Sequence, residues 1–150
     1  MNAKRTRRPP TRSRHVLRGR ADLARVRGIK NIHLLGKKNY SELPNYYRAV
    51  DVCIVAFQRT EHIRYSCPTR FYEHLAAGKP VVSTDFPAAR EFPEDMVRIA
   101  KDKEEFEQLV SESLKPGQDA FVERRKKLAR ENSWDGRAEK ISQMIEAGIS

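Results

Sequence analysis

Residues 66–84 read SCPTRFYEHLAAGKPVVST, a stretch that predicts a loop, a helix and a strand in this order. Pro68 suits the first turn of a helix, where its missing N–H costs nothing, and Ser66 or Cys67 would then be the cap. Three apolar residues at helical spacing give this helix one apolar face: Phe71, Leu75 and Ala76. The stretch therefore predicts a helix that begins near residue 68 and packs against a core.

The end of this helix is marked by Gly78, a residue suited to the left-handed backbone that stops helices, and by Pro80 just beyond it. Residues 81–84 (VVST) follow as a short buried strand, and residues 52–57 (VCIVAF) form another strand upstream. Strand, loop, helix and strand in this order make a βαβ unit, which implies a parallel sheet.

The start of the helix is a candidate ligand site, because open α/β sheets bind ligands at the carboxyl ends of their strands. Arg70 and Glu73 lie three residues apart, so that both side chains project from neighbouring faces of one turn. One interpretation is that Arg70 holds a phosphate while Glu73 accepts a hydrogen bond from a sugar hydroxyl. The other is a solvated ion pair on an ordinary crossover helix.

Further elements follow the same patterns on either side of this unit. Strands are predicted at residues 31–35 and 96–99, and a charged ligand loop at residues 58–65. Helices are predicted at residues 102–114, at residues 118–132 and from residue 133 onward. The pattern predicts an α/β fold, with a Rossmann-like parallel sheet of about four strands and a helical C-terminal extension.

The second of the three C-terminal helices carries two distinct sets of residues. Its apolar residues are expected to face the core: Phe121, Val122 and Leu128. The run Arg124-Arg125-Lys126-Lys127 resembles a nucleic-acid-binding patch, but we expect it to form a solvated helix face.

The composition bounds the class of protein. A length of 150 residues allows one domain with a core of moderate size. No apolar run approaches the roughly 20 residues that a membrane-spanning helix needs. Two cysteines, Cys53 and Cys67, are too few for a disulfide scaffold and have no zinc-ligand spacing. We therefore expect a cytoplasmic protein with reduced thiols and no metal, either freely dissolved or peripheral to the inner face of a membrane.

The net charge of +10 belongs to one segment of the chain. Residues 1–30 hold eleven Lys and Arg against one Asp, so that the rest of the chain is neutral in sum. We expect a basic, disordered arm over residues 1–28 and a globular domain over residues 29–150. Such an arm could bind nucleic-acid phosphates without sequence preference, but it has no aromatic residue to stack on bases, and we favour a solvated tail.

These pieces, taken in order, resemble the C-terminal, nucleotide-sugar-binding half of GT-B glycosyltransferases of the group 1 (family 4) type. Residues 31–36 are similar to a strand and glycine turn of that family, and residues 42–52 to its helix that leads into the next strand. Residues 68–82 are similar to its donor-site helix, which is the most specific of these motifs. Residues 132–135 resemble the motif of its closing helix, so that the resemblance spans about residues 29–148.

The resemblance implies a nucleotide-sugar donor, no metal or other cofactor, and a set of donor-binding positions. Glu73 would contact the ribose, and the turn at Gly36 and Lys37 would lie near the base. The positions implied at the diphosphate are Cys67, Pro68, Thr69 and Arg70. The protein would act mainly by electrostatic stabilisation of the departing diphosphate, and no catalytic side chain is implied.

The chain departs from the family pattern in three ways. Many members carry a second glutamate, eight residues before the helix glutamate, that meets the donor sugar, and Tyr65 stands at that position here. The βαβ region that usually opens the C-terminal half is absent or replaced by the basic arm. The acceptor-binding domain, which forms the other half of a GT-B cleft, is missing.

Three hypotheses follow. The first is a glycosyltransferase donor-binding domain that binds a nucleotide sugar, is inactive alone and needs a separate acceptor-binding domain or chain. The second is a non-catalytic nucleic-acid-binding protein acting through residues 1–28, and the third is a degenerate glycosyltransferase remnant. We expect the first, with no nucleic-acid partner. Because a missing βαβ region leaves a sheet edge exposed, we also expect marginal stability or self-association.

Overall fold

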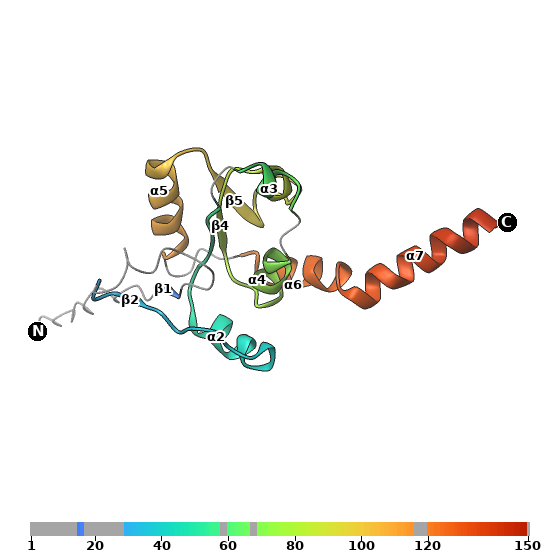
Figure 1. Ribbon diagram of the computed structural model, residues 1–150, viewed down its shortest axis with the longest axis horizontal. Helices are drawn as coiled ribbons and strands as arrows, with labels where there is room; N and C mark the ends of the chain where they lie inside the picture. The colour runs from blue at the N-terminus through green and yellow to red at the C-terminus, as the bar shows by residue number, and fades with distance from the viewer. Residues whose placement is uncertain (1–14, 17–28, 58–59, 67–68, 116–119, 150) are drawn as a thin grey trace, which may run out of the picture. The chain divides into compact units, whose positions relative to one another are not determined.

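A computed structural model describes residues 15–16, 29–57, 60–66, 69–115 and 120–149 of the chain (Figure 1). The chain divides into two compact units, residues 1–43 and residues 44–150. This division lies fifteen residues beyond the expected end of the basic arm at residue 28. Each unit is described by itself.

The first unit contains a two-stranded parallel sheet, in which β1 (His15–Val16) pairs with β2 (Ile32–His33). The strand predicted at residues 31–35 is therefore present, but within the described residues it pairs with β1 and not with the main sheet. β1 lies inside the segment expected to be disordered. A short 3₁₀ helix, η1 (Tyr40–Glu42), follows with a capping box formed by Asn39 and Glu42.

The second unit is built on a three-stranded parallel sheet in the order β3-β4-β5. The strands are β3 (Cys53–Val55), β4 (Val81–Thr84) and β5 (Val97–Ala100). The helices of this part are α2 (Leu43–Ala49), α3 (Glu61–Arg64), α4 (Arg70–Ala76), η2 (Pro87–Ala89), α5 (Lys103–Ser113), α6 (Val122–Glu131) and α7 (Trp134–Ile149). The predicted α/β fold with a parallel sheet and helical C-terminal part is confirmed.

One face of the sheet carries the core. Alternate strand residues share this face, since Cys53, Val81 and Val97 are in register across the three strands and all are buried. Helix α4 covers them with its own fully buried residues, Phe71 and Leu75. Phe71 also stacks on Phe86 and contacts Phe92, which extends the core to the loop after β4.

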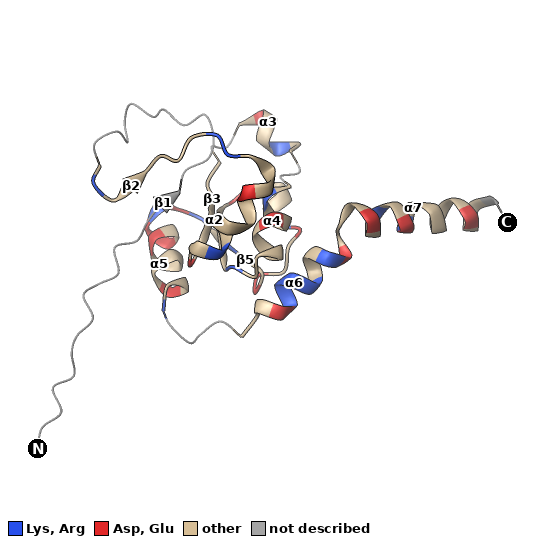
Figure 2. Cartoon of the chain, turned by 90° about the horizontal axis from the view of Figure 1, so that it is seen from below, with Lys and Arg blue, Asp and Glu red and all other residues tan. Residues whose placement is uncertain are grey.

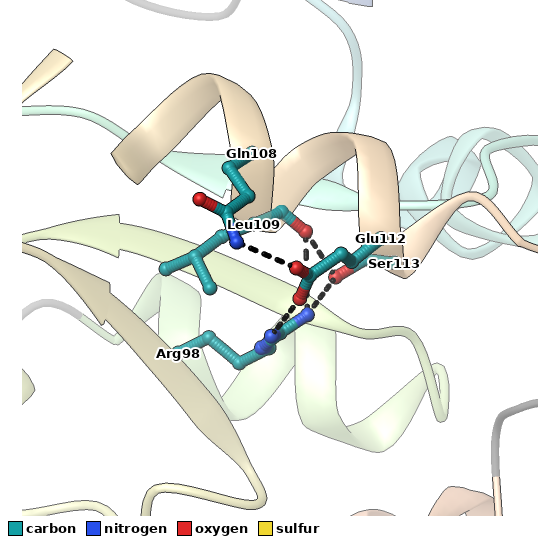
Figure 3. Close-up of polar contacts among 5 residues, drawn as sticks. All are labelled: Arg98, Gln108, Leu109, Glu112 and Ser113. Atoms are coloured by element: carbon teal, nitrogen blue, oxygen red, sulfur yellow. Dashed lines mark hydrogen bonds and ion pairs between the residues drawn. The ribbon is translucent and has the colours of Figure 1, made fainter. Parts of the chain in front are cut away.

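The opposite face of the sheet is held to α5 by Arg98 of β5 (Figure 3). The Arg98 guanidinium donates to the Glu112 carboxylate, to the Ser113 hydroxyl and to the Leu109 carbonyl, all on α5. Gln108 and Arg98 both donate hydrogen bonds to Glu112 and lower the pKa of its carboxyl below the ordinary value. The sheet is thus covered by helices on both faces, as in doubly wound folds.

Helix α4 ends as its sequence predicts, at Gly78. The Gly78 backbone has a φ of 71°, its N–H donates to the Leu75 carbonyl, and the Lys79 N–H donates to the His74 carbonyl. These are the two hydrogen bonds of a Schellman motif, which requires a left-handed residue at this position. Helix α6 approaches the turn closely, and Arg125 of α6 donates to the Gly78 carbonyl at 3.1 Å.

Two of the expectations for α6 are corrected by the structure, while Leu128 packs against the core as predicted. Arg125, predicted to lie on a solvated face, is buried against α4, and Ala129 is buried beside it. Phe121, predicted to face the core, is 36% exposed. The helix presents its Arg125–Ala129 side inward where α4 and α6 pack closely at Gly78, and the Arg125 guanidinium finds a hydrogen-bond acceptor there in the Gly78 carbonyl.

The other cations of the basic run on α6 lie among acidic partners (Figure 2). Arg124 pairs with Asp95, Lys126 with Glu123 and Lys127 with Glu131. This local pairing neutralises the helix face and disfavours its use as a phosphate-binding patch.

Replacing Gly78 by Ala is expected to lower the free energy of unfolding by about 2–4 kcal/mol, from the left-handed backbone and from overpacking. The new Cβ would lie 2.9 Å from Val122 Cγ1, a stiff β-branched side chain. Urea unfolding followed by circular dichroism measures the change. Gly148→Ala is the control, because nothing lies within 4 Å of its Cβ position and Ala favours helix. Equal stability of Gly78→Ala and the wild type would contradict this account.

Candidate functional site

The candidate site is built on the first turn of α4, which follows β3 and so begins toward the carboxyl ends of the parallel strands. The helix begins at Arg70 with Thr69 as its N-cap residue, and the Thr69 side chain makes no capping hydrogen bond. The cap predicted at Ser66 or Cys67 is therefore wrong by two or three residues. Cys67 and Pro68, predicted at the diphosphate, lie outside the described residues.

Glu73 is half-buried in the first turn of α4, and its carboxylate is held by one side chain from another helix. The Tyr47 hydroxyl of α2 donates a hydrogen bond of 2.7 Å to Glu73 Oε2. Among the described residues, Glu73 has no other hydrogen bond or ion pair through its carboxylate, so that Oε1 remains available to accept. This arrangement differs from the solvated Arg70–Glu73 pair that the sequence left open.

Two more contacts between α2 and α4 keep Tyr47 in place. The Tyr47 ring meets the His74 ring edge-on, with centroids 5.0 Å apart and planes at 82°. Beyond the end of α4, Lys79 Nζ donates to the Arg48 carbonyl at the end of α2. The two helices are therefore joined at Tyr47 by two contacts, and a third contact links the end of α2 to the segment just after α4.

His74 is a neutral member of this group. Burial lowers the pKa of its imidazole to about 4, and the positive charge of Arg70 one turn earlier lowers it further in the same direction. Its Nδ1 atom is buried and has no hydrogen-bond partner among the described residues. At neutral pH the ring thus adds no charge beside Tyr47 and Glu73.

The remaining predicted positions are spread over both units. Thr69 is exposed and Arg70 is half-buried, and both flank the first turn of α4. Gly36 and Lys37 belong to the first unit, where both are exposed and Gly36 has the left-handed φ of 66° expected of a glycine turn. The structure therefore joins Thr69, Arg70 and Glu73 in one turn of helix.

Tyr65, at the position where the resemblance leads us to expect an acidic residue, is 78% exposed at the end of α3. Residues 61–64, expected to be part of a loop, form α3, which Thr60 caps through its hydroxyl. Sequence patterns missed this helix because four residues are too few to show a period. Within the described residues, the exposed ring of Tyr65 therefore lies where a carboxylate was expected.

Several functions can be weighed against the described residues. No group of three or more His, Cys, Asp and Glu side chains in that part of the chain could hold a metal ion. No helix found there has the length and apolar character to cross a bilayer. Cys53 is buried, and burial raises the pKa of its thiol to about 12, which makes it an unreactive core residue.

The comparison with protein families identifies the class. Residues 5–116 match the family described as glycosyl transferases group 1, and this match covers most of the chain. The chain therefore belongs to the group 1 glycosyltransferases, and the resemblance found in its motifs is confirmed. The match begins at residue 5, inside the segment expected to be an arm, and ends before α6 and α7.

One curated protein of known name is similar in sequence to part of the chain. It is a protein of Bacillus subtilis (strain 168) named as a teichuronic acid biosynthesis glycosyltransferase, TuaH, and it is 24% identical to this chain over 111 residues. The match covers 71% of this chain and 28% of that protein, so that the chain spans little more than a quarter of the length of its relative. No solved structure matches the chain.

Tyr47 and His74 belong to the candidate site, but sequence reasoning did not select them. Tyr47 lies 26 residues from Glu73 in the sequence, so that no local pattern indicates their contact. His74 could have been found from the sequence, because it follows Glu73 directly. A histidine on the apolar side of a helix that also carries Arg70 is expected to stay neutral.

The stability of the protein is expected to fall on mild acidification because of His74. Its pKa is about 4 when folded and about 6.5 when unfolded, so between these values only the unfolded chain takes up the proton. The free energy of unfolding is therefore unaffected by the titration of His74 above about pH 6.5, and it falls by roughly 1.4 kcal/mol per pH unit from there toward pH 4. Urea unfolding between pH 5 and 7 measures the slope.

His74→Gln is the matched control, since glutamine is polar and does not titrate in this range. Its unfolding free energy should change less with pH than that of the wild type. The same slope in both proteins would show that another group causes the acid sensitivity.

Proposed function

We propose that the chain is the donor-binding domain of a group 1 glycosyltransferase and binds a nucleotide sugar through Glu73. The observation that carries this proposal is the half-buried Glu73 carboxylate, held on one oxygen by Tyr47 and open on the other. An ionised carboxylate accepts hydrogen bonds from hydroxyl groups strongly, and the vicinal hydroxyls of a ribose present two such donors.

The diphosphate is proposed to lie beside the start of α4. Arg70 supplies a full positive charge there, and the family resemblance implies that Cys67, Pro68 and Thr69 lie beside the diphosphate, where the backbone N–H groups of Cys67 and Thr69 would donate to it. Gly36 and Lys37 are proposed to lie near the base. Charge that develops on the departing diphosphate would be stabilised by these groups, which is the part of sugar transfer that a donor domain can contribute without a metal ion.

Transfer itself is proposed to need a second, acceptor-binding domain, on a separate chain or elsewhere in a longer one. Tyr65 supports this limited role, because an exposed, uncharged phenol accepts hydrogen bonds from the hydroxyls of a donor sugar more weakly than a carboxylate does. The acceptor is proposed to be a glycan or a lipid-linked glycan, and the location to be cytoplasmic.

Calorimetry with a panel of UDP-, GDP- and ADP-sugars tests the proposal. At least one of these donors should release heat on binding, and no sugar should be transferred to water or glycan acceptors by this chain alone. Glu73→Gln should weaken binding about 10- to 100-fold, because the hydrogen bonds to the ribose lose their charged acceptor.

Glu107→Gln provides the control of the same chemistry. Glu107 is exposed on α5 in a weak pair with Lys103, on the opposite face of the sheet from α4. Its replacement should leave donor binding unchanged. A folded wild-type sample that binds none of the donors would instead favour the degenerate remnant.

The nucleic-acid alternative depends on residues 1–28, which lie outside the described residues except for β1. It therefore remains a prediction from composition, as does self-association.

A further inference from the structure

Tyr47 is the feature of the site that the family resemblance does not explain. Its hydroxyl reaches Glu73 from a different helix, across 26 residues of sequence, with a donor–acceptor distance of 2.7 Å. This is the length of a strong hydrogen bond to a charged acceptor.

The Tyr47 ring has little freedom to turn. It is half-buried and meets the buried His74 ring edge-on at 5.0 Å, while the Lys79–Arg48 hydrogen bond joins the end of α2 to the end of α4. A phenol whose ring is held in this way presents its O–H in one direction. The position of α2 therefore determines the direction in which the Tyr47 hydroxyl holds the Glu73 carboxylate.

Tyr47 and His74 add no positive charge beside the carboxylate. His74 lies behind the ring as a neutral imidazole, and the phenol offers a hydrogen bond without a charge. A lysine in place of Tyr47 would hold Glu73 as firmly but would compete with a ligand for its negative charge. A tyrosine fixes the carboxylate and leaves its charge for hydroxyl donors.

We propose that Tyr47 is a positioning residue for ribose recognition: it holds Glu73 Oε2 so that Oε1 and the second lone pair of Oε2 receive the vicinal hydroxyls of the nucleotide. This inference rests on the proposed function. It adds a determinant of specificity, since a fixed carboxylate distinguishes a ribose from a sugar without hydroxyls better than a mobile one does.

The test is the ratio of two affinities measured with Tyr47→Phe. This variant keeps the ring against His74 and removes only the hydroxyl. The probes are UDP, GDP and ADP, each paired with its 2′,3′-dideoxy counterpart, in calorimetric titrations of the full chain. The wild type should prefer the ribose form of the bound nucleotide about tenfold or more. Tyr47→Phe should reduce that preference to less than about threefold, while its affinity for the dideoxy form stays unchanged.

Two further variants separate positioning from folding. Tyr72→Phe removes a hydroxyl from α4 whose ring packs on Phe92, and it should keep the full ribose preference. In the Glu73→Gln background, Tyr47→Phe should have no further effect on the ratio, because the two residues act through one carboxylate. Thermal melts confirm that each variant is folded.

Each other outcome counts against a defined claim. Equal losses of affinity for both nucleotide forms in Tyr47→Phe would reduce Tyr47 to a structural residue and overturn the inference. An unchanged ribose preference in that variant would also overturn the inference but would leave the proposed function standing. A wild type that binds nucleotides without any ribose preference would overturn the inference and the Glu73–ribose contact, and would leave only nucleotide binding. A wild type that binds no nucleotide overturns the proposed function and this inference together.

Discussion

The packing of α6 on the end of α4 is the contact on which the candidate site depends. Arg125 is buried and donates to the carbonyl of Gly78, while the lack of a side chain at Gly78 lets Val122 approach. Removing a guanidinium from water costs several kcal/mol unless hydrogen bonds replace those to water, which restricts α6 to placements that supply such partners. The same turn ends α4 and begins β4, so it fixes the helix that carries Glu73.

Much of the second unit could be predicted from sequence because its signals are local. The glycine stop at Gly78, the valine run of β4 and the Asp102–Glu105 capping pair each involve a few neighbouring residues with strong backbone preferences. Glu73 could be selected as a candidate ligand residue for the same reason, since its position in the motif is a matter of spacing. The family comparison confirms the family that the motif indicates, and the role of Glu73 is a proposal.

Features that depend on contacts between distant segments could not be predicted. Arg125 sits in a run of four cations, and only the approach of α6 to Gly78 distinguishes it from its neighbours. The Tyr47–Glu73 hydrogen bond likewise arises from the packing of α2 on α4. Patterns of polarity place Phe121 in the core and Arg125 in solvent with its three neighbours, because they contain no information on which carbonyl lies within reach.

The Schellman turn has a geometric consequence for the site. Glu73 lies five residues before Gly78, and each residue of an α-helix advances the direction of the side chain by about 100°. Because the turn fixes where the helix ends, it also fixes the direction in which the Glu73 side chain projects from the helix axis. Insertion or deletion of one residue between the two would swing Glu73 by more than a quarter turn and take it out of reach of Tyr47. The site therefore requires that the spacing of five residues between Glu73 and Gly78 be kept.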